Sequence, residues 1–349
     1  MIYWKNTFLN KKERDIMSAV IEIKNVSKEF KVLNRREGLK GSLKDLFSRD
    51  YKTVKAVDNI SMTIEQGEIV GYLGPNGAGK STTIKMMTGV LEPTSGEILV
   101  GGNVPYQNRT KNAQEIGVVF GQRSQLWWAL PLVESFKLLK DIYQIPDEKY
   151  ESILKLYRSL VDIEPLLHKP VRQMSLGQRT LSDILAAFLH DPKIVFLDEP
   201  TIGLDVSMKA KIRTLIHALN KEKNTTVILT THDMGDVDAL CRRIVIIDKG
   251  KMLYDNDIEH LKGFFGSYRT LKLRIDGDMQ EQAKHIQKEL PEFSVSADDE
   301  WISVLVDEEK AKVIDVLGKL QHSYNIRDMQ LEEISTEEVI KKIYEEGVQ

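Results

Sequence analysis

Short apolar runs alternate along most of the chain with longer stretches in which apolar side chains recur every three or four positions. Runs with the length of buried strands occur at 69–73, 116–120, 194–197 and 226–230. Helical spacing is found at 131–167 and 208–219. Strands that alternate with helices form a parallel sheet with helices on its faces. The pattern therefore predicts an α/β fold built on a mostly parallel sheet.

The pattern changes near residue 267. Strand-like and helix-like segments then follow in the order 271–275, 279–290, 293–295, 301–306, 310–320 and 326–331. Ser335 and Glu338 have the spacing of a capping box that opens a final helix. A strand-helix-strand-strand-helix-strand order predicts a small ferredoxin-like α+β module. The expected organisation is an extension at 1–19, a main domain at 20–262 with a helical subdomain at about 123–190, and an accessory domain at 267–349.

Composition narrows the classes of protein to consider. The chain has 349 residues, of which 42% are hydrophobic and 29% charged, with a formal net charge of -3. This balance gives no overall attraction to nucleic acid or to an anionic membrane. The single cysteine, Cys241, excludes an intramolecular disulfide framework and is expected to be structural. No apolar run approaches the roughly 18 residues of a spanning helix, so we expect membrane contact through a partner.

Two N-terminal segments leave alternatives open. Residues 1–15 contain no apolar core long enough for a secretory signal, and Met17 is an alternative start to Met1. Residues 31–55 carry eight basic and three acidic side chains, a local charge of +5. That stretch is either a solvated loop or a contact for lipid head groups or a membrane partner, since its leucines can form one stripe of a short helix.

A phosphate-binding motif follows the apolar run at 69–73. The sequence Gly-Pro-Asn-Gly-Ala-Gly-Lys-Ser has the P-loop spacing, and apolar residues at helical spacing come after it. Glycines let backbone N–H groups converge on phosphate oxygens at the positive end of the next helix. Lys80 is expected to reach the β and γ phosphates, and Ser81 to bind the metal. The expected nucleotide-binding residues here are Gly74, Pro75, Asn76, Gly77, Ala78, Gly79, Lys80, Ser81 and Thr82.

Two carboxylates stand at the end of another buried run. Asp198 and Glu199 follow the run at 194–197, where ligands of an open parallel sheet bind. Asp198 is expected to hold hydrated Mg²⁺ together with Ser81, because magnesium takes few protein ligands and keeps several waters. Glu199 is positioned to polarise a water against the γ-phosphate. The sequence therefore predicts a site for a nucleoside triphosphate and Mg²⁺.

Further motifs resemble those of ABC ATPases. Met174-Ser-Leu-Gly-Gln-Arg precedes Asp198 and resembles the family's signature loop, although Met174 and Leu176 depart from its commonest pattern. Gln122 is similar to the glutamine-loop residue, Asp205 to that of the aspartate loop, and His232 to the switch histidine. The resemblance spans 20–261 in the family's order, and it identifies a P-loop NTPase fold of ABC ATPase type with a helical subdomain.

The resemblance implies roles for these residues. Ser175, Gly177 and Gln178 would contact the γ-phosphate of an ATP bound to a second copy, so the chain is expected to form a homodimer with two ATP molecules between its subunits. Glu199, His232 and Gln122 would be catalytic, with Gln122 also a metal ligand and Asp205 in the nucleotide site. Phe30 is expected to stack on adenine, with Tyr51 as the rival and simple core packing as the plain alternative for Phe30.

The segment 117–131 resembles the glutamine loop of exporter ATPases of the drug, daunorubicin and viologen types. Trp127 and Trp128 within it are either core residues or part of a cleft for a membrane subunit. The implied protein is a cytoplasmic ATPase on the inner face of the membrane that drives a separately encoded permease, with export of drug-like or lipophilic compounds expected and no nucleic-acid partner.

Other classes make different predictions from this sequence. A polysaccharide exporter would carry an all-β domain after residue 267, and a ribosome- or DNA-directed ABC protein would carry tandem ATPase units. A regulatory protein without turnover would lack Glu199 or His232.

Overall fold

The computed structural model describes residues 19–33, 51–121, 124–264 and 266–346. Gln122, which the sequence assigns to catalysis, lies outside the described residues, as do most of the basic stretch and the extension at 1–18. The chain divides into two compact units between Asp255 and Asn256. This division precedes the boundary expected from the sequence, which lay between residues 262 and 267. Each unit is described by itself below.

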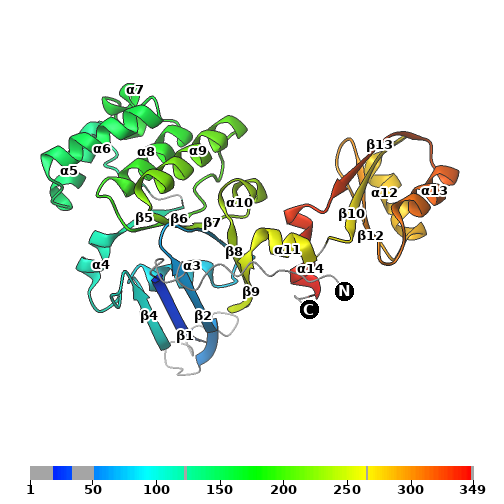
Figure 1. Cartoon of the computed structure of the whole chain (residues 1–349), viewed down its shortest axis with the longest axis horizontal. Coiled ribbons are helices and arrows are strands. Elements are labelled where there is room, and N and C mark those ends of the chain that lie inside the picture. The colour runs from blue at the N-terminus through cyan, green and yellow to red at the C-terminus, as the bar shows by residue number, and fades with distance from the viewer. Residues whose placement is uncertain (1–18, 34–50, 122–123, 265, 347–349) are drawn as a thin grey trace, which may run out of the picture. The chain divides into compact units, whose positions relative to one another are not determined.

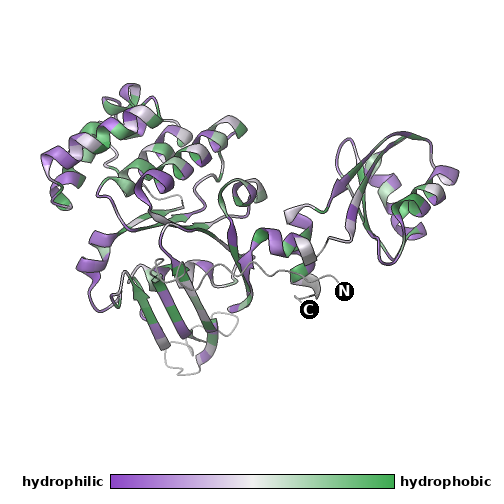
Figure 2. Ribbon diagram, viewed as in Figure 1, coloured by the Kyte–Doolittle hydropathy of each residue, from purple (hydrophilic) through white to green (hydrophobic). Residues whose placement is uncertain are grey.

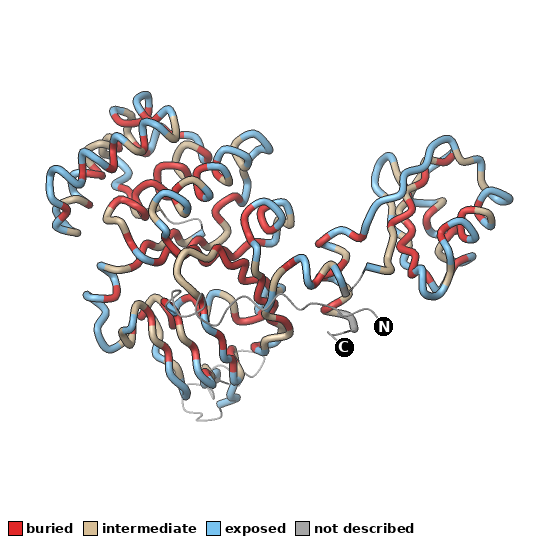
Figure 3. The backbone as a smooth tube through the Cα atoms, in the orientation of Figure 1, coloured by how far each residue is buried: buried red, intermediate tan, exposed pale blue. Residues whose placement is uncertain are grey.

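The central sheet of the first unit has six strands in the order β5-β6-β7-β3-β8-β9. Its strands are β3 (Ile69–Leu73), β5 (Ile116–Phe120), β6 (Ile194–Asp198), β7 (Thr226–Thr230), β8 (Arg243–Asp248) and β9 (Lys251–Asp257). β5, β6, β7, β3 and β8 pair in parallel, as their alternation with helices predicts. Figure 3 shows the middle strands buried along their whole length, which explains their unbroken apolar sequences.

A second, antiparallel sheet of three strands lies in the same unit. It has the order β2-β1-β4, with β1 (Ala19–Leu33), β2 (Tyr51–Glu65) and β4 (Ser95–Val100). α3 (Lys80–Met87) packs between the two sheets, because its Ile84 and Met87 share one buried cluster with residues of both. This packing fixes the start of α3, and hence the P-loop, against both sheets.

Helices cover the other side of the six-stranded sheet (Figure 1). They are α5 (Leu132–Ile142), α6 (Asp147–Leu160), α7 (Glu164–Leu167), the 3-10 helix η1 (Val171–Gln173), α8 (Leu176–Phe188), α9 (Val206–Lys223) and α10 (Met234–Leu240). The short α4 (Arg109–Glu115) lies instead near the end of α3, where its Asn112 is close to Gly89. α5 and α6 are amphipathic, and Figure 2 shows their apolar and polar residues on different faces. The Tyr157 hydroxyl of α6 donates to the Leu185 carbonyl of α8 at 2.6 Å, which ties these two helices of the subdomain together.

The second unit begins with α11 (Ile258–Phe264) and contains a four-stranded antiparallel sheet in the order β11-β12-β10-β13. Its strands are β10 (Tyr268–Ile275), β11 (Ser294–Ala297), β12 (Ile302–Asp307) and β13 (Ile326–Glu333). α12 (Met279–Glu289) and α13 (Val313–Ser323) supply apolar residues to the core beneath it. This arrangement has the ferredoxin-like order of elements, so the all-β domain of a polysaccharide exporter is absent from the described residues.

The capping signal predicted at the start of the last helix is confirmed. At the start of α14 (Thr336–Glu346), the Glu338 N–H donates to the Ser335 hydroxyl at 3.2 Å and the Ser335 N–H to the Glu338 carboxylate at 3.0 Å. This is the expected capping box. One expectation was wrong in part: residues 31–33 and 51–55 of the basic stretch are strand rather than loop or helix, since Leu33 pairs with Tyr51. Over the described ranges, the helices are too short or too polar to cross a bilayer.

Candidate nucleotide-binding and hydrolysis site

The P-loop joins β3 to α3, and two of its glycines have no room for a side chain. A Cβ on Gly74 would lie 2.5 Å from the Ile247 carbonyl oxygen, and one on Gly79 would lie 2.4 Å from the Ala56 carbonyl oxygen. Gly79 also has a φ of 111°, in the left-handed region that favours glycine. The loop can therefore pass close to two neighbouring strands and still direct its N–H groups outward.

Lys80 lies over this loop at the first position of α3. Its ammonium donates to the carbonyl oxygens of Gly74 at 2.5 Å and Pro75 at 3.1 Å. Burial lowers the pKa of Lys80, while the charges of Glu199 and Asp198 act in the opposite direction. A cation held between the loop and two carboxylates is placed to meet the charge of a polyphosphate.

A cavity of about 350 Å³ opens in front of the loop. Its lining unites most of the predicted phosphate and metal residues, which are Pro75, Asn76, Gly77, Gly79, Lys80, Ser81, Thr82, Asp198 and Glu199, together with Ala56 and Gly121. Ser81 and Asp198 thus share one cavity, and both offer the hard oxygen atoms that magnesium prefers. The donor set fits a magnesium ion that keeps most of its ligands as water and phosphate. Nucleotide phosphates and metal can therefore be held at one place.

The two carboxylates at the end of β6 have different partners. The Thr230 hydroxyl of β7 donates to the Asp198 carboxylate at 2.5 Å, which orients it without neutralising it. Glu199 has a φ of 51°, and its N–H donates to the Thr230 carbonyl oxygen at 2.9 Å. This strained turn directs the Glu199 side chain away from the strand. The sequence analysis missed Thr230, whose only signal was a hydroxyl within an apolar strand.

His232 lies beside Glu199. Its Nδ1 is 3.2 Å from Glu199 Oε1, and the imidazole is largely exposed. The structure therefore joins the predicted switch histidine and the predicted catalytic carboxylate at the rim of the phosphate cavity. An imidazole in contact with a carboxylate can hold it in one orientation, which is what a group that positions water requires.

The signature residues lie apart from this cavity. Ser175 caps α8, where its hydroxyl accepts from the Gln178 N–H at 3.2 Å and its own N–H donates to Gln178 Oε1 at 3.2 Å. Gly177 is required because a Cβ there would lie 2.5 Å from Met208 Cγ. None of the three predicted contact residues Ser175, Gly177 and Gln178 is among the described residues that line the phosphate cavity.

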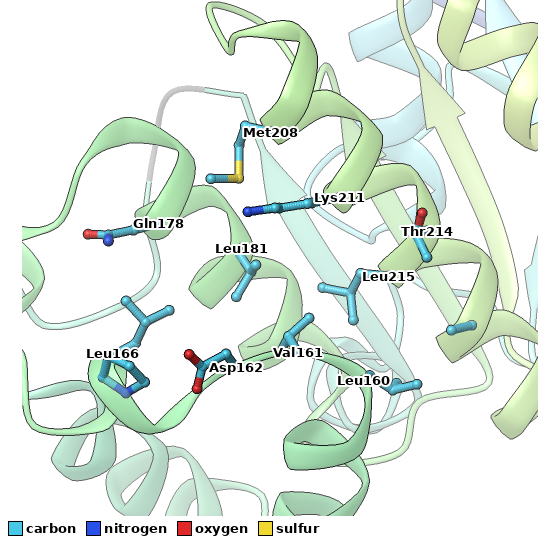
Figure 4. Close-up of a pocket in the computed structure, with 12 residues that line it drawn as sticks. Leu160, Val161, Asp162, Leu166, Gln178, Leu181, Met208, Lys211, Thr214 and Leu215 are labelled. Atoms are coloured by element: carbon cyan, nitrogen blue, oxygen red, sulfur yellow. The ribbon is translucent and has the colours of Figure 1, made fainter.

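A crevice of about 500 Å³ opens between α8, α9 and the segment 160–166 near the signature loop (Figure 4). Leu181 of α8 and Met208 and Leu215 of α9 border it, and Gln178 reaches its edge. Asp205 is the N-cap of α9, and its Oδ1 accepts a hydrogen bond from the Met208 N–H at 2.9 Å. The predicted aspartate-loop residue therefore fixes the start of the helix against which the signature loop rests.

A buried acidic residue that the sequence analysis missed organises the switch region. Asp236 of α10 accepts hydrogen bonds from the hydroxyl of Thr201, from the hydroxyl of Thr231 at 3.0 Å and from Arg213 Nε at 2.6 Å. Asp236 is fully buried. It links the loop after Glu199, the residue before His232 and α9, so it stabilises the surroundings of both proposed catalytic side chains.

A second missed acid holds the segment that follows Gln122. Asp183 of α8 accepts from the Ser124 hydroxyl at 2.9 Å and the Gln125 N–H at 3.1 Å. Burial raises the pKa of Asp183 to about 6, against the opposing effects of these hydrogen bonds and of Arg179. The signature helix and the glutamine-loop segment are therefore joined directly. Its signal in the sequence was one carboxylate on the apolar face of α8.

The aromatic candidates are not core residues. Phe30 is 37% exposed with the Lys28 ammonium 5.4 Å from its ring centre, and Tyr51 is 54% exposed. Both remain available for stacking, and the choice between them as adenine platform stays a prediction. Trp127 and Trp128 are also exposed, which removes the core alternative for them, and the Arg179 guanidinium lies 5.3 Å from the Trp128 ring centre.

Comparison with known proteins decides the family. Residues 57–202 match the model of the "ABC transporter" family. The ABC transporter ATP-binding protein NatA of Bacillus subtilis (strain 168) is 34% identical over 215 residues, which cover 62% of this chain and 87% of that protein. The chain belongs to the family of ABC transporter ATP-binding proteins. Its first unit is accordingly an ABC ATPase domain that binds ATP.

Other relatives differ in length and name. The bacitracin transport ATP-binding protein BcrA of Bacillus licheniformis is 34% identical and covers 61% of this chain and 68% of that protein. The chain spans only 28% of ABC transporter A family member 1 of Dictyostelium discoideum, at 34% identity over 73% of this chain. The cassette MJ0796, solved as a dimer bound to ADP and Pi, aligns with a TM-score of 0.54 at 25% identity over 68% of this chain and 98% of that one.

Proposed function

We propose that this chain is the ATP-hydrolysing subunit of an ABC transporter, and that it forms a homodimer with two ATP molecules between the subunits. The observation that carries the proposal is the separation of two half-sites on one chain. The phosphate cavity holds Lys80, Ser81 and Asp198, whereas Ser175 and Gly177 lie outside it. A two-fold axis brings the second half-site of one copy to the first half-site of the other.

Hydrolysis in this proposal is a matter of positioning and electrostatics. Glu199 orients the attacking water, His232 holds Glu199 and contacts the γ-phosphate, and Lys80 offsets the charge on the phosphates. Ser81 and Asp198 would hold magnesium, which would supply positive charge to offset that of the phosphates. Gln122 is assigned to the same centre by its resemblance alone.

The partner in this proposal is a separately encoded membrane permease, and the chain sits on the inner face of the membrane. The name of the bacitracin transport relative supports export of drug-like or lipophilic compounds. The exposed Trp127 and Trp128 support a docking cleft for the permease, since aromatic side chains are favoured anchors at protein interfaces. The described residues contain neither a second ATPase cassette nor an all-β module, so they give no support to the alternative classes.

The Glu199→Gln variant tests the hydrolytic part. We expect it to bind ATP, to form dimers at saturating ATP and to lose at least about 100-fold in turnover, because the water loses its orienting carboxylate. Glu281→Gln, an exposed change on α12, is the matched control and should retain turnover. Retained turnover in Glu199→Gln rejects its role, and a monomer at saturating ATP rejects the shared site.

Membrane copurification tests the transport part. The tagged wild-type chain is expected to bring down an integral membrane protein with about six apolar spans. Recovery of ribosomes or nucleic acid alone would overturn the assignment to transport.

A further inference from the structure

Lys209 of α9 holds the segment that carries His232. Its ammonium donates to Asp233 Oδ2 at 2.5 Å, and Asp233 directly follows His232 in the chain. Both side chains of this ion pair are mostly buried, with 27% and 25% of their surfaces exposed. Burial acts to raise the pKa of Asp233, but Lys209 and Arg213 outweigh it and lower that pKa, so the carboxylate stays charged. The pair is therefore a lasting contact of the folded chain.

The backbone of Lys209 is tied to the aspartate loop, residues 203–205. The Lys209 N–H donates to the Asp205 carbonyl oxygen at 2.9 Å, and Asp205 caps α9. Lys209 thus lies in the first turn of α9, with its backbone on the aspartate loop and its side chain on Asp233. Two direct contacts therefore connect the aspartate loop to the neighbour of His232.

The chain on both sides of His232 is anchored by side-chain hydrogen bonds. The Thr231 hydroxyl donates to the Asp236 carboxylate at 3.0 Å, and the Asp233 N–H donates to the Thr231 hydroxyl at 3.0 Å. The imidazole of His232 is itself 67% exposed. Few groups pack against such a ring, so its reach depends on how firmly residues 231 and 233 are held. A contact that fixes Asp233 therefore also fixes His232.

The fold around Asp233 does not depend on Lys209 alone. Asp233 Oδ1 accepts from the Gly235 N–H at 2.9 Å, which caps α10, and from Arg213 Nη2 at 3.2 Å. Loss of the Lys209 ammonium would leave the cap and one cation in place. What it would remove is the contact that holds Oδ2, and with it the link from the aspartate loop to the segment of His232.

We propose that Lys209 is a positioning residue for ATP hydrolysis: by binding Asp233 it sets the place of His232 relative to Glu199 and the aspartate loop. The described residues that line the phosphate cavity do not include Lys209, so it acts through Asp233 and not on the phosphates. This role rests on the proposed function, since it requires that His232 contacts the γ-phosphate. It adds a residue of α9 to the groups that keep His232 and Glu199 in register.

Steady-state kinetics of the full-length Lys209→Met variant test the role. The substitution removes the ammonium and keeps an apolar stem. The kcat should fall about 10- to 100-fold, because a small displacement of a positioned group has an effect of that size. The KM for ATP should change less than about twofold, since the phosphate cavity is intact. Lys221→Met, the same change in the exposed last turn of α9, is the matched control and should keep the wild-type kcat.

A double-mutant cycle tests whether Lys209 acts through Asp233. Serine is a good N-cap, so Asp233→Ser keeps the start of α10 but removes the carboxylate that Lys209 binds. In the Asp233→Ser background, Lys209→Met should lower kcat by less than about a further twofold. An equal loss in both backgrounds would show that Lys209 works by another route and would overturn the proposal.

Folding and assembly are measured on the same variants. Circular dichroism of Lys209→Met at the assay temperature should match wild type, because Arg213 still binds Asp233. Lys209→Met combined with Glu199→Gln should still form dimers at saturating ATP. Loss of the fold, loss of that dimer, or a Lys209→Met kcat within about twofold of wild type would each overturn the positioning role. Retained turnover in Glu199→Gln is instead a failure of the proposed function, so the two can be told apart.

Discussion

The buried carboxylate of Asp183 makes the stability of the ATPase unit depend on pH. Its pKa is about 6 in the folded chain against an ordinary value of 3.8, and the two-unit rise corresponds to about 3 kcal/mol. Because the folded pKa is raised, the folded state binds more protons than the unfolded state between pH 4 and 6. The contribution is present in full below the unfolded pKa and is lost as pH rises through about 6.

Asp183→Asn isolates this contribution. The amide oxygen can still accept from Ser124 and Gln125, but the side chain no longer titrates. We expect the free energy of unfolding of Asp183→Asn, minus that of wild type, to increase by about 2.4 kcal/mol from pH 4 to pH 7. The measurement is urea unfolding at a series of pH values, with Asp141→Asn, an exposed change on α5, as control.

Two outcomes would refute this reasoning. A difference that changes by less than about 1 kcal/mol would mean that burial does not perturb Asp183 as the geometry indicates. A difference of opposite sign would mean that the hydrogen bonds from Ser124 and Gln125 outweigh burial. Asp183→Ala tests the hydrogen bonds themselves, since it leaves both donors without an acceptor. It should cost about 2–4 kcal/mol at pH 4 and less at pH 7, where the buried charge already destabilises wild type.

Three further outcomes follow from packing. Gly177→Ala should destabilise the ATPase unit by about 1–3 kcal/mol in thermal unfolding, because its Cβ meets Met208, and Met208→Ala in the same chain should recover part of the loss. Asp236→Ala should cost about 3–5 kcal/mol, because Arg213 keeps its charge without its buried partner; an unchanged melting curve would contradict the network. Cys241 should resist maleimide in native protein and react after unfolding, because burial raises its thiol pKa.

Sequence patterns predicted the parallel sheet, the P-loop and the ferredoxin-like module because each depends on local order. A strand buried on both faces, such as Ile69–Leu73, has to be apolar throughout, and a loop that approaches Ala56 closely has to contain glycine. The strand segments 31–33 and 51–55 have no comparable sequence pattern. Those residues are mostly exposed, so backbone pairing alone extends the hairpin, and pairing leaves no pattern in the side chains.

The missed site residues have partners that are distant in sequence. Asp183 meets Ser124 across 59 positions, and Asp236 meets Thr201 across 35 positions. Each is a single polar residue within an apolar segment, where a sequence offers no sign of which donor will satisfy it. Only the assembled fold shows that both acids are hydrogen-bonded, Asp236 to the loop after Glu199 and Asp183 to the segment after Gln122.

The cap of the signature helix bears on how the second half-site can act on phosphate. The Ser175 hydroxyl accepts from the Gln178 N–H, and a hydroxyl that accepts still has its own proton to donate. Gln178 Oε1 accepts from the Ser175 N–H and from the Lys169 ammonium at 2.9 Å, which fixes the turn in place. The capping box therefore leaves the Ser175 O–H directed by a rigid loop at the positive end of α8. A γ-phosphate on a second copy would meet a donor that is already oriented, so closure of the dimer would require little rearrangement within either chain.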